Sequence, residues 1–397
     1  MTTNSALSTS LRSLRLRRLL AGAGVLAVAA VAFTGSPAWG EPGENGPREK
    51  IVFTNSCLCP QLEAVMKSEI YIMNPDGSKP TRLTNDDFGD GLPVLSPDGK
   101  GKIVFDSNRI AISGGGTPGD SDLFLINHDG TADGALLPRP LTRGSSASFD
   151  PTGKNIAFHR SASDTYGTKI GGRTEPGGPT TDSDIFLVNL DDLEEGTLPV
   201  NLTNGLTSTP GVRGPYASDD ADWSPDGKWI AFTSRIPDVP LEQSDAGIYV
   251  MNLETRVVTK LTNFNNNVEE RSPAWSPDGT RIAINRRAPP PTPAFEIWVL
   301  GFDPGGPRVT SETRLTENTF PDLTTAWSPT GEKIVFHTTR PPPPPGFTRN
   351  FPQIFVMNAA DGSNQHALTG TSAPPGALLG QNLFPKWGRI EVGRDPK

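Results

Sequence analysis

Carboxylates gather at recurring points of this sequence, in a pattern that could bind a cation or a charged partner. Ten charged residues fall in four short clusters: Asp86, Asp87 and Asp90; Asp219, Asp220 and Asp222; Glu269, Glu270 and Arg271; and Asp322. Converging carboxylates, together with the amides of residues 265–267, are the oxygen ligands that a hard cation such as Ca²⁺ prefers. The sequence contains no EF-hand loop, and a solvated acidic surface explains the same residues. We therefore keep two expectations: a partner-binding role for the ten residues, and a structural Ca²⁺ in a central channel.

The two cysteines, Cys57 and Cys59, stand one residue apart. Exposed thiols of an exported protein tend to oxidise, but a bridge across a single residue is geometrically awkward. A strained bridge and a link to another molecule both stay open. Two cysteines make neither a disulfide framework nor, by themselves, a metal site.

The composition favours turn-rich β structure. The chain has 397 residues, of which 42 are Gly and 40 are Pro, and 35% are hydrophobic. Long helices are not expected at that density of helix breakers. Since no basic stripe interleaved with aromatic residues occurs, the sequence also argues against nucleic-acid binding.

Residues 1–40 have the features of a secretory signal peptide. Four arginines, from Arg12 to Arg18, precede the apolar run 19–33, and small residues at Ala38 and Gly40 fit cleavage after Gly40. The run of about fifteen is shorter than the ~20 residues that a membrane-spanning helix needs, although an uncleaved anchor is the alternative. We expect export to the periplasm, the cell envelope or the exterior. Loss of the four arginines changes the formal net charge from −8 to −12.

A repeat of 53 to 61 residues organises the rest of the chain. A Leu-Thr pair marks each repeat, with the leucines at Leu83, Leu141, Leu202, Leu261, Leu315 and Leu368. Ahead of each pair come the same segments in the same order. They are an aromatic or apolar residue with a Ser-Pro-Asp-Gly type turn, a run such as Ile230–Phe232, and a run such as Ile248–Met251. Pro, Asp and Gly suit a tight turn, and the flanking runs have the β-branched and aromatic content of strands.

Each repeat predicts four antiparallel strands, and radially stacked copies of such a sheet form a β-propeller. The first repeat lacks its opening segment, and the missing segment follows the last Leu-Thr pair at Phe384–Trp387. The sequence therefore predicts an all-β, six-bladed propeller over 41–397, in which the C-terminal strand completes the first blade and removes the free sheet edges. The predicted units are about 50–85, 86–142, 143–203, 204–262, 263–316 and 317–369, with the closing strand at about 383–390.

These motifs resemble the TolB-type, WD-like β-propeller repeat family. The resemblance rests on the Trp-Ser-Pro-Asp-Gly, Ile-Ala-Phe, Ile-Tyr-Val-Met-Asn and Leu-Thr series and covers about 50–390. It implies the propeller fold. TolB also has a small α/β domain ahead of its propeller, which is understood to engage its membrane-complex partners. Here the repeat begins about ten residues after the signal, so a role in a Tol system does not follow from the resemblance.

Variation in loop length predicts which face of the propeller binds a partner. The turns between first and second strands are tight and repetitive, whereas the connections between second and third strands and between blades are long and differ in every blade. They include 54–69, 107–121, 161–183, 204–220, 235–246, 263–273, 286–295 and 340–352. Because binding residues favour loops on a rigid scaffold, we expect a monomer that binds a protein, peptide or glycan through this face. Neutral insertions are the alternative.

A second set of acids opens the third strands and suggests structure more than binding. It consists of Glu69, Asp122, Asp184 and Glu296, with Asp245 nearby. Recurrence at one position of a repeat favours a capping role.

An enzyme is the alternative function. Similar propellers accompany peptidases whose α/β-hydrolase domain carries the catalytic triad, but this chain has no Gly-x-Ser-x-Gly motif. Similar lyases use several histidines around a metal. The four histidines here, His128, His159, His337 and His366, are expected at different repeat positions and not around one mouth. We therefore expect a non-catalytic protein without a required cofactor. A hydrolase or lyase acting at the channel mouth stays the alternative.

Overall fold

The Ser-Pro-Asp-Gly sequences form the tight turns that the residue types predict. Between β12 (Ala217–Trp223) and β13 (Trp229–Arg235), the Ser224 hydroxyl donates to Asp226 Oδ1 at 2.6 Å, and the Gly227 N–H donates to the Ser224 carbonyl at 2.9 Å. Gly227 adopts a φ of 72°, a conformation that glycine reaches without steric cost. The turn therefore brings the two strands back antiparallel.

Twenty-four strands and one short 3₁₀ helix, η1 (Leu190–Asp192), make up the part of the chain that the computed structural model describes. That part comprises 48–56, 68–108, 121–136, 144–161, 183–192, 199–203, 217–235, 246–262, 268–287, 294–340, 350–370 and 381–391. All of it belongs to one compact unit, residues 42–397. The predicted signal peptide lies outside the described residues. Within them, no helix is long and apolar enough to cross a bilayer.

The strands form six blades of four antiparallel strands each. From the inner to the outer strand, the blades are β24 (Gln381–Ile390), β1 (Arg48–Ser56), β2 (Ser68–Met73) and β3 (Thr81–Arg82); β4 (Asp90–Leu95), β5 (Lys102–Ser107), β6 (Asp122–Asn127) and β7 (Ala132–Leu136); β8 (Ser145–Phe149), β9 (Asn155–Ser161), β10 (Ser183–Asn189) and β11 (Val200–Asn201); β12, β13, β14 (Gly247–Asn252) and β15 (Val258–Lys260); β16 (Glu270–Trp275), β17 (Arg281–Arg287), β18 (Phe295–Asp303) and β19 (Arg308–Arg314); and β20 (Asp322–Trp327), β21 (Lys333–Thr338), β22 (Gln353–Asn358) and β23 (His366–Ala367). A single parallel bridge, Ser183 with Ala217, joins the third and fourth blades into one sheet. The predicted fold class, a six-bladed β-propeller, is confirmed.

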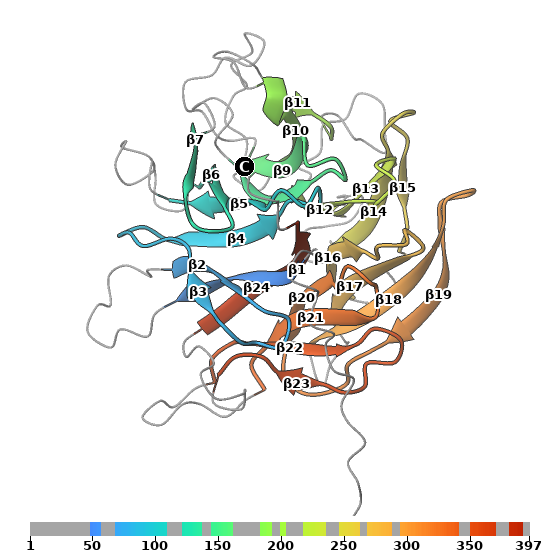
Figure 1. Cartoon of the computed structure of the whole chain (residues 1–397). Helices are drawn as coiled ribbons and strands as arrows, with labels where there is room; N and C mark the ends of the chain where they lie inside the picture. Colours follow the sequence, from blue (N-terminus) through green and yellow to red (C-terminus); the bar gives the residue numbers. More distant parts are fainter. Residues whose placement is uncertain are drawn as a thin grey trace, which may run out of the picture. The chain divides into compact units, whose positions relative to one another are not determined.

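The C-terminal strand closes the ring, as the sequence predicts. β24 pairs antiparallel with β1, with Trp387 opposite Ile51, so the first blade takes its inner strand from the far end of the chain. Figure 1 shows the red β24 beside the blue β1. The Trp387 Nε1–H also donates to Glu49 at 3.1 Å. Because the closing strand is paired along its length, this blade keeps no free inner edge.

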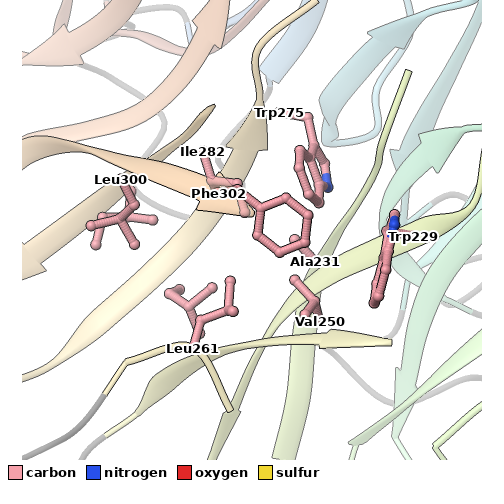
Figure 2. Close-up of a cluster of buried hydrophobic side chains, with 10 residues drawn as sticks. Trp229, Ala231, Val250, Leu261, Trp275, Ile282, Leu300 and Phe302 are labelled. Carbon is pink, nitrogen blue, oxygen red and sulfur yellow. The ribbon is translucent and has the colours of Figure 1, made fainter. Parts of the chain in front are cut away.

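Apolar side chains fill the spaces between neighbouring blades. Between the fourth and fifth blades, Phe302 lies edge-on to Trp275 at a centroid distance of 4.9 Å and to Trp229 at 5.6 Å, as Figure 2 shows. Edge-to-face pairs of this kind stabilise a core beyond their buried area. Trp275 and Trp327 are buried, as predicted for the aromatic residue before the turn, whereas Trp223 at the equivalent position is half-buried.

The threonine of each Leu-Thr pair joins the outer strand to the start of the third strand. In the first blade, Thr84 Oγ1 accepts the Ile70 N–H at 2.9 Å and donates to Glu69 at 2.7 Å. Thr203 with Asp184 and Thr316 with Glu296 repeat this arrangement. The acids that open the third strands are thus part of a structural cap, which explains why the motif recurs. Asp245 lies outside the described residues.

Candidate functional site

Each of the six inner strands contains a β-bulge at the same place. The register against the second strand slips there, and one residue takes a positive φ of 48° to 53°. The six bulge residues are Leu92, Ser146, Asp220, Ser272, Thr324 and Phe384. None of them is a glycine, so this conformation is strained and must be held by the surroundings. Sequence analysis did not anticipate the bulges.

A side chain from the preceding blade holds the bulge in at least three of the six strands. Thr54 Oγ1 accepts the Leu92 N–H at 3.1 Å, Thr233 Oγ1 accepts the Ser272 N–H at 3.1 Å, and Asn285 Oδ1 accepts the Thr324 N–H at 3.0 Å. We call the residue at this point of each second strand the latch residue. By register, the six are Thr54, Asp106, His159, Thr233, Asn285 and His337. Each follows the apolar run of its second strand, and this was the sequence signal that could have identified them.

Three of the six latch residues titrate, and burial governs all three. Burial raises the pKa of Asp106 to about 8, although the Ser145 hydroxyl and the Ser146 N–H favour its ionised form. Burial lowers the pKa of His337 to about 4, and the ring lies edge-on to Phe384 at 5.5 Å. Burial also lowers the pKa of His159, against the opposing effect of Asp220. Both histidines are therefore neutral near pH 7.

The prediction that the four histidines occupy different repeat positions is wrong for His159 and His337. They are equivalent latch residues of the third and sixth blades, which lie opposite each other in a ring of six. Each packs against a different bulge, so they do not converge on a common point.

The inner strands contact one another in a closed circle and line a central channel. Their half-buried side chains lie near the bulges and divide the wall into two arcs. The sixth, first and second blades contribute the apolar Leu323, Leu383, Phe384, Leu92 and Val94. The third to fifth blades contribute the polar Ser145, Ser146, Asp219, Asp220, Asp222, Arg271 and Ser272. Of these wall residues, the sequence prediction included Asp219, Asp220, Asp222 and Arg271 and missed the apolar arc.

Asp222 and Lys386 interact across the channel, although they come from opposite blades. Burial raises the pKa of Asp222, and the Lys386 charge opposes that rise. The Asp222 carboxylate also accepts the Trp275 N–H at 2.7 Å and the Ser148 hydroxyl at 3.1 Å. The channel therefore carries a charged pair whose acid is tied to both neighbouring blades.

Three of the predicted binding acids are buried between blades. Asp90, Glu270 and Asp322 are at most 2% exposed. Arg340 pairs with Asp322, and Arg286 pairs with Glu270 at 2.5 Å. Buried paired carboxylates of this kind hold neighbouring strands together and are not available to a partner. Glu269 forms ion pairs with Arg271 and Arg287 outside this set.

One group of carboxylates has the spacing of a cation site. Oxygens of Glu69, Asp86 and Asp90 lie within 4.8 Å of one another. The group sits where β2 and β4 begin, and Arg82 already pairs with Glu69. Asp86 and Asp90 belong to a predicted cluster, but the group is at the boundary of the first two blades and not in the channel.

Most of the long connections lie outside the described residues, including 57–67, 109–120, 162–182, 204–216, 236–245, 263–267 and 341–349. The expectations for a loop-rich face, for Cys57 and Cys59, and for residues 265–267 therefore stay predictions. Asp87 is described and belongs to the link between β3 and β4, where it has an interaction partner.

The comparisons with known proteins agree with this architecture. Residues 212–374 match the model of the TolB beta propeller domain family. The propeller is of the TolB type. TolB from Acinetobacter baumannii superposes with a TM-score of 0.57 at 19% identity, covering 85% of this chain and 66% of that one. A putative TolB from Agrobacterium tumefaciens gives 0.51 at 20% identity, covering 87% and 99%.

Two curated relatives match shorter stretches. A probable dipeptidyl-peptidase 5 from Aspergillus niger is 30% identical over 100 residues, and the uncharacterized peptidase YuxL from Bacillus subtilis is 38% identical over 77 residues. The matches cover 22% and 19% of this chain but only 14% and 11% of the relatives. The TolB-type propeller thus shares repeats with these proteins over a small part of their length.

Proposed function

We propose that this TolB-type propeller is an exported, non-catalytic binding protein whose channel and surrounding face receive a segment of a protein, peptide or glycan. The observation that carries the proposal is the two-sided channel wall. An apolar arc faces an arc with three aspartates, and the strained bulges hold both in fixed positions. Preorganised walls lower the entropic cost of binding.

The chemistry of the wall indicates the ligand class. Leu92, Leu383 and Phe384 offer apolar surface, whereas Asp219 and Asp220 lie on the opposite arc and would attract a positive charge. Such a wall suits a peptide segment that carries an apolar side chain next to a lysine, an arginine or a free amino group. Arg271 and Lys386 restrict where that charge can lie.

Peptidase activity is the second candidate, because the curated relatives with matching repeats are named as peptidases. The described histidines do not support a triad, since burial keeps His159 and His337 neutral and each is packed against a bulge. We propose that the chain binds and does not cleave. Incubation of the mature chain with a mixed peptide library, followed by mass spectrometry, should give no cleavage products; turnover that Ser145→Ala or His159→Ala abolishes would establish the enzyme.

Peptide phage display on residues 41–397 tests the binding proposal. We expect enriched peptides that combine an apolar residue with Lys or Arg. Asp219→Ala should weaken the best peptide at least tenfold, while the matched control Asp226→Ala, on an exposed turn, should not. Binding that tolerates Asp219→Ala and Phe384→Ala but is lost in Asp226→Ala would place the site on the turn face and refute the proposal.

A further inference from the structure

The outer hairpin of the fifth blade differs from those of the other blades. β19 has seven residues, whereas the outer strands β3, β7, β11, β15 and β23 have two to five. Figure 1 shows β18 and β19 in orange as a long hairpin at the rim of the ring. Six of the seven residues of β19 are exposed. The fifth blade thus presents a long outer strand that the blade itself does not need.

The backbone of β19 keeps one edge directed away from its own sheet. The Leu315 N–H donates to the Ile297 carbonyl at 2.8 Å, and Thr313 and Ser311 follow it at two-residue steps. Because backbone groups alternate in direction along a strand, the N–H and C=O groups of Glu312 and Arg314 face outward. Among the described strands, β18 is the partner of β19, and β19 ends its sheet. An edge of this kind is a template for another strand.

A polar cavity of about 550 Å³ lies beside this edge, between β15 and β19. Its lining includes three cations, Lys260, Arg286 and Arg308, but the acid Glu312 alone among carboxylates. Arg286 reaches Glu312 at 2.8 Å, and the Glu312 side chain is 44% exposed. An incoming carboxylate can therefore take the place of Glu312 on Arg286. In a chain with a net charge of −8, this local excess of cations favours an acidic ligand.

We propose that the outer edge of β19 docks an extended acidic segment of a partner protein. The segment adds to the fifth blade as a fifth strand through the outward groups of Glu312 and Arg314, and one of its acidic side chains enters the cavity. Strand addition draws affinity from main-chain hydrogen bonds and specificity from alternate side chains. A second copy of β19 does not fit this role, because full antiparallel overlap would put Arg308 opposite Arg314.

The probe is a fluorescein-labelled peptide, Thr-Val-Glu-Val-Asp-Val-Thr, which places its acids on one face of a strand. Fluorescence anisotropy with residues 41–397 should give a Kd of about 10–100 μM, the range of a small transient interface. A peptide with Lys at both acidic positions tests the charge requirement, and one with Pro at the central Val tests the main-chain bonds. Both should bind at least tenfold more weakly.

Charge reversal provides the matched variant. Lys260→Glu combined with Arg308→Glu changes exposed residues and should leave the melting temperature within a few degrees. It should weaken the acidic peptide at least tenfold and strengthen the lysine peptide, while Asp219→Ala in the channel should change neither. Amide exchange at Glu312 and Arg314 should slow when the acidic peptide binds. No binding of the acidic peptide, equal binding of the proline peptide, or unchanged affinity in the charge-reversed variant would each overturn the proposal.

Discussion

Replacing Asp106 by asparagine should stabilise the propeller at alkaline pH. The Asp106 carboxyl is 6% exposed and its pKa is raised to about 8 from 3.8, so the folded state holds its proton more tightly than the unfolded chain does. The stabilisation is complete below about pH 4 and is lost as pH rises through 8. An amide has no such dependence. Asparagine also fits the site, because Asn285 is the latch residue of the fifth blade and accepts the Thr324 N–H at 3.0 Å.

The size of the effect follows from the shift. About four pKa units correspond to about 5–6 kcal/mol as an upper limit, and relaxation around a buried charge reduces it. We expect Asp106→Asn to be more stable than the parent by about 2 kcal/mol or more at pH 9, and near parity at pH 4.5.

Urea unfolding of residues 41–397, followed by tryptophan fluorescence at pH 4.5, 7 and 9, measures this difference as a shift in midpoint at constant slope. Ser145→Ala is the control: it removes the hydroxyl that favours the ionised form, so the loss of stability should begin at lower pH. A parent protein whose stability does not fall between pH 5 and 9, or an Asp106→Asn variant that follows the same pH curve, would refute the reasoning.

Three further predictions concern the fold. Trp275→Ala should cost about 3–5 kcal/mol in chemical denaturation, and Trp223→Ala, at the equivalent but half-buried position, clearly less. Deletion of 381–397 should abolish the single cooperative transition in calorimetry, since it removes β24 from the first blade; an unchanged melt would contradict closure. Asp278 has its pKa lowered to about 2 by hydrogen bonds from Ser276 and Thr280 that outweigh burial. Stability from this group is present above pH 4 and lost as pH falls through 2, so Asp278→Asn should reduce stability at pH 7 by about 0.5–1 kcal/mol, an amount discounted for exposure, and flatten the acid limb of a pH titration.

The repeat made the fold predictable from the sequence. The turn residues, the strand runs and the displaced segment around Trp387 each determine a local structure, and one architecture satisfies all of them. The blade boundaries followed from the same motifs. The caps formed by Thr84 with Glu69 were also predictable, because both residues recur at fixed positions.

The site was less predictable, because it depends on contacts between blades. A local pattern does not reveal that Leu92 and Phe384 take a positive φ, since the bulge is held by a side chain from another repeat. Asp90 and Asp322 look like exposed acids in the sequence, and only the positions of their neighbours bury them. The apolar arc escaped notice because its residues resemble ordinary core positions.

Hydrogen–deuterium exchange of residues 41–397, with and without the peptide selected by display, tests the central claim most directly. The account predicts slower exchange around the bulges of β4, β12, β16 and β24, with little change in the turns at 96–99 and 276–279. Protection confined to those turns, or no protection on the inner strands, would contradict a binding role for the channel.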